Sequence, residues 1–96
     1  MKHCIIVKFK KDVDYKSLIP EIKELFNNCK EIAGIDDVLI YENVIDRSNR
    51  YNLMIQIIMN KDALSTYDEC IYHKIWKDKY GSLIESKAIF DMEDAY

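Results

Sequence analysis

Residues 60–83 read NKDALSTYDECIYHKIWKDKYGSL, and their apolar side chains form two helical stripes that are rotated with respect to each other. The first stripe comprises Ala63, Leu64, Tyr67 and Ile71, and the second comprises Tyr72, Ile75, Trp76, Tyr80 and Leu83. A single straight helix of this length would be roughly 34 Å long, whereas a strand of about nine residues spans only about 30 Å. We therefore expect the helical region to bend or break between Cys70 and His73.

Alternating and helical apolar patterns predict four strands and a further helix around this region. The strands are expected at Lys2–Lys10, Asp37–Ile45, Tyr51–Met59 and Lys87–Met92, and the helix at Ser17–Ala33. A polar turn, Asp46–Arg50, follows the second strand, and Glu93–Tyr96 forms an acidic tail. The resulting order, βαββαβ, predicts an α+β, ferredoxin-like fold in which a four-stranded antiparallel sheet carries both helices on one face.

The first predicted helix has signals at both ends. Pro20 has no backbone N–H and is tolerated in a first helical turn, which places the N-cap near Ser17. Gly34 is expected to end the helix as a residue in the left-handed conformation.

Composition and charge narrow the class of protein. The chain has 96 residues, 49% of them hydrophobic and 32% charged, which predicts one globular domain over residues 1–96. Because the net charge is −3 and the basic residues are scattered, no nucleic-acid partner is expected. The apolar start is too short for a signal peptide or a membrane span, which predicts a cytoplasmic protein without membrane contact. The three Cys form no CxxC pair, which favours reduced, mostly structural thiols.

One face of the predicted sheet is left without a helix. Ile6, Met54 and Ile58 lie on that face among polar residues. Apolar side chains there favour a homodimer through the sheet face, with the two sheets packed together. The alternative is an open, half-solvated sheet with scattered apolar residues.

His3, Tyr67 and His73 are the candidate site residues. His3 on the first strand and Tyr67 on the first helical stripe should face the space between sheet and helices. On a straight helix His73 would project about 120° away from Tyr67, so the two converge only if the helix bends. An imidazole with an ordinary pKa of about 6.5 suits a general base. The structural alternatives are a surface or capping His73 and a core Tyr67 with a satisfied hydroxyl.

No cofactor or metal ion is expected. Cys70 and His73 could share a metal ion, but no further cluster of ligating residues completes such a site. With only two Gly residues, the chain has no Gly-rich loop for a phosphate group.

Collinear motifs along the chain resemble the stress-responsive α/β-barrel (Dabb) domain family. They are KHCIIVKFK, IAGI, RYNLMIQIIM, ALSTYDECIYHKIW and the closing AIFDME. The resemblance covers essentially the whole chain and implies a ferredoxin-like protomer, a dimeric α+β barrel and a pocket between helices and sheet. Where the family often has Pro within the helix bend, this chain reads Cys70-Ile71-Tyr72-His73.

The family includes olivetolic acid cyclase, which closes a linear polyketide by aldol condensation without a metal or organic cofactor. This distant resemblance matches His3, Tyr67 and His73 to the residues of that chemistry. It implies that His73 would abstract a proton from the carbon beside a carbonyl, while Tyr67 would hydrogen-bond the carbonyl oxygen. His3 would position the substrate. The expected apolar wall of the pocket comprises Val7, Leu25 and Trp76.

Three functions stay open from the sequence. The first is a dimeric stress-responsive protein that binds a small apolar or carbonyl-bearing molecule without defined chemistry. The second is a cofactor-independent lyase or polyketide cyclase. The third, by likeness to other dimeric α+β barrels, is a monooxygenase or a haem-handling protein.

Overall fold

The computed structural model describes residues 1–95, which fold as a sheet covered on one side by helices. The elements are β1 (Lys2–Phe9), α1 (Tyr15–Asn27), a 3₁₀ turn η1 (Asn28–Glu31), β2 (Ile35–Glu42), β3 (Leu53–Met59), η2 (Lys61–Ala63), α2 (Leu64–Glu69), α3 (Ile71–Tyr80), η3 (Gly81–Leu83) and β4 (Ile84–Met92). Within residues 1–95, every helix is too short and too polar to cross a membrane.

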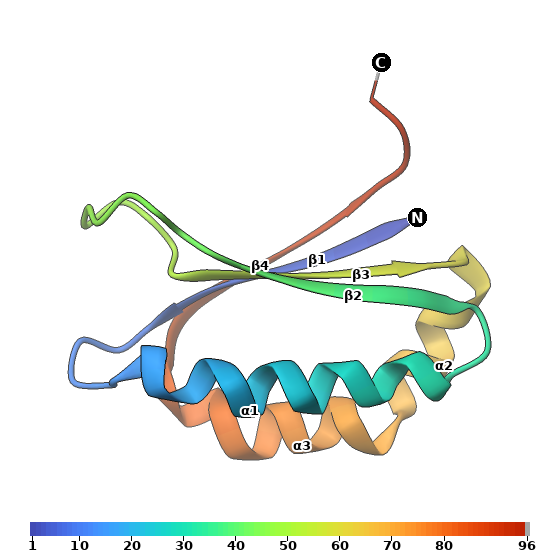
Figure 1. Cartoon of the computed structure of the whole chain (residues 1–96), viewed down its shortest axis with the longest axis horizontal. Helices are drawn as coiled ribbons and strands as arrows, with labels where there is room; N and C mark the ends of the chain where they lie inside the picture. The colour runs from blue at the N-terminus through green and yellow to red at the C-terminus, as the bar shows by residue number, and fades with distance from the viewer. Residues whose placement is uncertain (96) are drawn as a thin grey trace.

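The four strands form one antiparallel sheet in the order β2-β3-β1-β4. Helices α1 and α3 lie side by side on one face of it, and the other face carries no helix (Figure 1). This arrangement confirms the predicted ferredoxin-like fold.

The core lies between the sheet and the helices because side chains alternate along the two central strands. On β3 every second residue is buried, as the spacing predicts, and β1 shows the same alternation except that Cys4 on its other face is also buried. Ile22 and Phe26 of α1 and Trp76 and Tyr80 of α3 complete the core from the helical side. The Phe26 and Trp76 rings meet edge to face, with centroids 5.1 Å apart.

The helical region breaks at Cys70, as the change of phase predicts. Cys70 is extended (φ −74°, ψ 159°), and its backbone N–H closes α2 on the Tyr67 carbonyl at 3.1 Å. Its Sγ accepts a bond from the His73 backbone N–H at 3.4 Å and so caps α3. The break therefore needs no Pro. It also turns Ile71 outward, where its side chain is 58% exposed, so the prediction that Ile71 belongs to an apolar stripe is wrong.

Helix α1 begins earlier than predicted. Its N-cap is Asp14, and the Ser17 hydroxyl donates to the Asp14 carbonyl at 2.8 Å instead of capping. Pro20 is consequently the sixth helical residue and not part of the first turn. Pro20 is exposed, so the carbonyl it leaves without a donor lies on the side of the helix that faces water.

Gly34 has the predicted left-handed conformation (φ +93°), but it lies in a turn beyond the helix. The Ile35 N–H bonds the Ile32 carbonyl at 3.1 Å, which makes Gly34 the third residue of a four-residue turn into β2. A Cβ added at this position would lie 3.1 Å from the Cβ of Ala63, so Gly also permits close packing against η2.

Five strand boundaries differ from prediction, and one of them is the end of β1, which lies at Phe9 instead of Lys10. β2 begins two residues earlier than expected and ends at Glu42, and β3 begins at Leu53 because Tyr51 is an exposed part of the connecting loop. β4 begins three residues earlier, where its register with β1 shifts. The last residue of the predicted acidic tail, Tyr96, lies outside the described residues.

Replacing Gly34 by Ala tests the turn. We expect G34A to lower the free energy of unfolding by about 1–3 kcal/mol, because Ala disfavours a positive φ and its methyl group approaches Ala63. G81A is the matched control, since Gly81 is helical with nothing within 4 Å of an added Cβ. That variant should be unchanged or more stable by up to about 1 kcal/mol. If urea unfolding shows the same change in stability for G34A and G81A, the turn at Gly34 does not require glycine.

Candidate functional site

The rings of His3, Tyr67 and His73 meet at the break between α2 and α3. Tyr67 lies between the two imidazoles, with ring centroids 5.5 Å from His3 and 4.9 Å from His73. The extended Cys70 accounts for this convergence, because it separates the two helices that carry Tyr67 and His73. Tyr67 and His73 were expected to converge only if the helix bends, and the bend at Cys70 is what brings them together.

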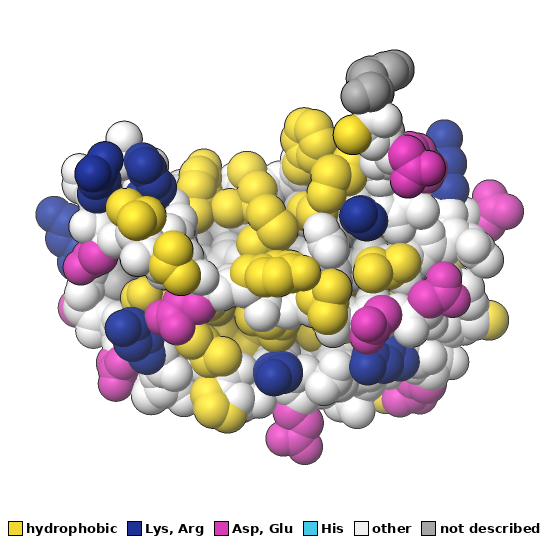
Figure 2. Space-filling model, turned by 45° about the horizontal axis from the view of Figure 1, so that its top comes forward, with side chains coloured by type: hydrophobic (Ala, Val, Ile, Leu, Met, Phe, Trp, Pro, Cys, Tyr) yellow, Lys and Arg dark blue, Asp and Glu magenta, His cyan; other side chains and the backbone are white. Residues whose placement is uncertain are grey.

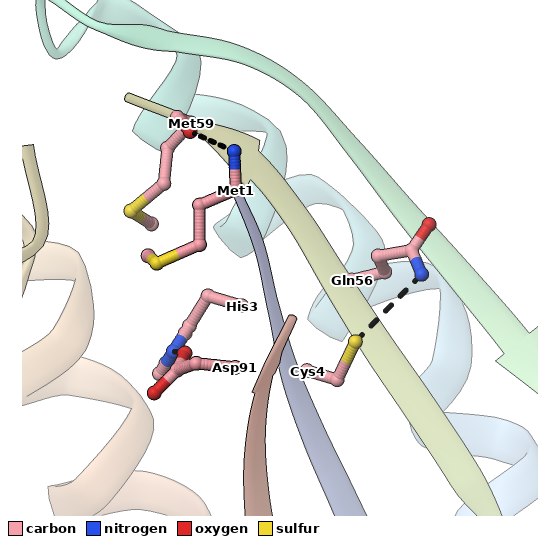
Figure 3. A network of polar contacts seen from close by, with 6 residues as sticks. All are labelled: Met1, His3, Cys4, Gln56, Met59 and Asp91. Carbon is pink, nitrogen blue, oxygen red and sulfur yellow. Dashed lines mark hydrogen bonds and ion pairs between the residues drawn. The ribbon is translucent and has the colours of Figure 1, made fainter. Parts of the chain in front are cut away.

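His3 is held by a carboxylate from the last strand. Its Nδ1 lies 2.5 Å from Oδ1 of Asp91, which is its register partner across β1 and β4 (Figure 3). A carboxylate only accepts, so Nδ1 of His3 carries the proton. The His3 side chain is 8% exposed and that of Asp91 is 42% exposed, so the pair spans the boundary between core and solvent.

His73 is oriented by the end of α2. Its Nδ1 lies 2.9 Å from the backbone carbonyl oxygen of Asp68. Because a carbonyl oxygen can only accept, Nδ1 is the protonated nitrogen of neutral His73. This leaves Nε2 with its lone pair available to a ligand, as a general base requires.

The Tyr67 hydroxyl is buried and has no hydrogen-bond partner among residues 1–95. Burial is the main cause that raises the pKa of Tyr67 far above its usual value, and the Cys29 and Cys70 thiols and Asp68 add to it. Tyr67 is therefore neutral and keeps its proton as a donor. An unsatisfied buried hydroxyl destabilises a fold by about 1–3 kcal/mol.

A hollow of about 300 Å³ lies beside these rings, between β4 and the helices. Its lining comprises His3, Ile5, Leu64, Asp68, His73, Trp76, Lys87, Ile89 and Asp91. Both imidazoles thus reach a space that a small molecule can enter, whereas the fully buried Tyr67 does not line it. A larger hollow of about 560 Å³ lies at the β2–β3 loop and contains neither His.

Only one of the three expected wall residues lines the hollow. Trp76 does so, although it is almost fully buried. Val7 lies in the core, where none of its surface is exposed, and Leu25 packs against that core from α1.

Six residues of the lining were not identified as site residues from the sequence, and two of them, Ile5 and Leu64, were predicted only as inward-facing apolar positions. Asp91, Ile89 and Lys87 come from alternate positions of β4, and Asp68 supplies a backbone oxygen to His73. Antiparallel pairing of β1 with β4 was the available signal, because it places the closing Phe-Asp beside His3. The contact between Asp68 and His73 depends on the angle between α2 and α3, which the sequence pattern does not predict.

Among residues 1–95, no group of three or more His, Cys, Asp or Glu side chains is placed to hold a metal ion. Cys70, which was considered as a ligand together with His73, uses its sulfur to cap α3.

Comparison with known proteins gives the fold a context. No family model matches the chain, and no curated protein matches it either. Solved structures do match. A Dabb family protein with a ferredoxin-like fold from Mesorhizobium loti is 14% identical, with a TM-score of 0.65, over 99% of this chain and 96% of its own.

The chain has the fold of a Dabb protein. A dimeric ferredoxin-like protein of unknown function from Jannaschia is 16% identical with a TM-score of 0.76, and the match covers 97% of each chain. The hydroxynitrile lyase of Passiflora edulis is 11% identical with a TM-score of 0.72, over 99% of this chain and 94% of the lyase. The Dabb-type fold thus occurs both in proteins without a known role and in a lyase.

The unpartnered hydroxyl of Tyr67 gives a stability prediction. Y67F should raise the free energy of unfolding by about 1 kcal/mol, because it removes a buried donor that has no acceptor. Y80F is the matched control, since the Tyr80 hydroxyl donates to Glu21 Oε1 at 2.6 Å and its loss should destabilise the chain. Urea unfolding measures both, and a destabilised Y67F would show that its hydroxyl has a partner in solution.

Proposed function

We propose that this protein binds a small carbonyl-bearing molecule in the hollow between β4 and α3. The observation that carries the proposal is the pair of imidazoles lining that hollow, each fixed through Nδ1 by an oxygen acceptor. Both Nε2 atoms are then available to a ligand. Apolar side chains from Ile5 and Trp76 would hold the carbon skeleton.

A second candidate function is cofactor-independent lyase or cyclase chemistry at the same site. His73 Nε2 would take a proton from the carbon beside the carbonyl, and negative charge would develop on the carbonyl oxygen. Tyr67, neutral and without another acceptor, would donate to that oxygen, while His3 would position the substrate. Because the hydroxyl is buried, ligand entry has to open the packing around Tyr67. The lyase among the structural neighbours supports this candidate.

The proposal includes a homodimer through the outward face of the sheet. Cross-strand register places Tyr41, Met54, Ile6 and Ala88 in one row across all four strands, with Phe90 in the next row. Figure 2 shows apolar side chains gathered over this face and charged ones toward its ends. The side chains of Phe90 and Tyr41 are 61% and 50% exposed, which is a large apolar area for a monomer. The dimeric neighbour from Jannaschia supports self-association of this chain.

A cytoplasmic location is part of the proposal. All three cysteines, Cys4, Cys29 and Cys70, are free thiols, and the first two are buried. Free thiols are typical of a reducing compartment.

Ligand binding and proton transfer can be tested with one neutral ketone, 2-octanone. We expect it to shift the NMR resonances of His73 and Trp76, and we expect the protein to accelerate exchange of its α-protons in D₂O. H73Q should lower that exchange by about 100-fold or more, since the base is lost, while binding changes by only a few fold. The control is K74Q, whose exposed side chain lies outside the hollow. If 2-octanone binds but its α-protons do not exchange faster, carbonyl binding stands and the lyase or cyclase chemistry is refuted. If it does not bind, both proposed functions are refuted.

The dimer can be tested with two equally exposed residues on opposite sides of the molecule. F90K introduces a charge on the outward sheet face, and I71K introduces one on the helical side, where Ile71 is 58% exposed compared with 61% for Phe90. We expect F90K to weaken self-association at least tenfold in analytical ultracentrifugation, because it buries a charge at the interface. I71K should associate like the wild type. A monomeric wild type at micromolar concentration would contradict the proposed assembly.

A further inference from the structure

One wall of the hollow is the inward face of β4. Lys87, Ile89 and Asp91 occupy alternate positions on this strand and all line the hollow. Their register partners on β1 are Val7, Ile5 and His3. The wall therefore has a cation at one end, an apolar side chain in the middle and the His3–Asp91 pair at the other end.

The two charged ends of this wall differ in their partners. Asp91 is bonded to His3 at 2.5 Å. Lys87, like several other exposed lysines, has no hydrogen bond or ion pair to a residue within 1–95, whereas Lys8, Lys74 and Lys79 each have a carboxylate partner. Lys87 is also the only Lys or Arg that lines this hollow. Its ammonium group is therefore available to a ligand.

We propose that the hollow selects a linear carbonyl compound that carries one carboxylate, with Lys87 binding the carboxylate and the imidazoles binding the carbonyl. This inference rests on the proposed binding of a carbonyl compound in the hollow. Asp91 lies four positions after Lys87 on the strand, which is about 13 Å between backbone positions. The lysine side chain covers part of this distance. A ligand chain of several methylene groups that lies over Ile89 can therefore reach from the Lys87 ammonium group to the imidazoles.

The charges around the hollow favour a single negative charge on the ligand. Asp68 and Asp91 also line it, so a multiply charged phosphate or pyrophosphate would meet two carboxylates and only one ammonium group. Lys87 contributes a single compact positive charge, which balances one negative charge on a ligand.

The experiment compares 7-oxooctanoate with its methyl ester, in which a methyl group removes the negative charge at the end remote from the ketone. Dissociation constants are measured by NMR titration for wild type, K87Q, K87R and K77Q. Lys77 is an exposed residue of α3 outside the hollow and serves as the control. Since Lys87 is exposed, its replacement should leave the fold intact, and circular dichroism checks this.

In the wild type we expect the acid to bind about three- to tenfold more tightly than the ester, with a preference that falls as salt is added. K87Q should remove the preference and leave the ester's affinity unchanged, whereas K87R and K77Q should retain it. Equal binding of acid and ester by the wild type, or a preference that survives in K87Q, would overturn the role of Lys87 while the proposed function stands. Binding of neither compound would overturn both.

Discussion

The contact between the Cys70 sulfur and the His73 backbone N–H sets the arrangement of the whole site. It starts α3 one residue after α2 has closed, in a chain that has no Pro at this point. Two short helices then replace one long helix, and their facing ends bring Tyr67 and His73 together over His3. The same break supplies the Asp68 carbonyl, an acceptor that a continuous helix would have used for its own backbone. The break at Cys70 thus accounts for the geometry of the site and frees the acceptor that fixes the tautomer of His73.

The fold was predictable because it depends on patterns that local sequence expresses. Alternation along β1 and β3, and the change of phase near Cys70, predicted the sheet and the break. The errors came where one local signal allows more than one structure. Pro20 suggested a late start for α1, but the helix begins at Tyr15, after an Asp14 whose side chain makes no capping hydrogen bond, and the proline faces solvent. For the site, the meeting of the three rings was predicted from the bend. The contribution of Lys87 and Ile89 was not predicted, because it depends on which side of the edge strand β4 faces the hollow.

Tyr67 shows how stability and function oppose each other at this site. Its ring is fully buried and packs against both imidazoles, while its hydroxyl has no acceptor among the described residues 1–95. Phenylalanine would serve the core better, so the hydroxyl is the part of the side chain that packing does not explain. Burial also prevents its ionisation, which makes Tyr67 a donor and not a base.

The pairing of His3 with Asp91 has a consequence for how the protein is made. The two residues are separated by 88 positions in the sequence and meet only when β4 is added to the edge of the sheet beside β1. Closing a loop of this length costs conformational entropy, so the pair exists only in a chain in which β1 and β4 already lie side by side. A chain in which β4 is not paired lacks this wall of the hollow. The hollow is therefore complete only when the first and last strands of the sheet are joined.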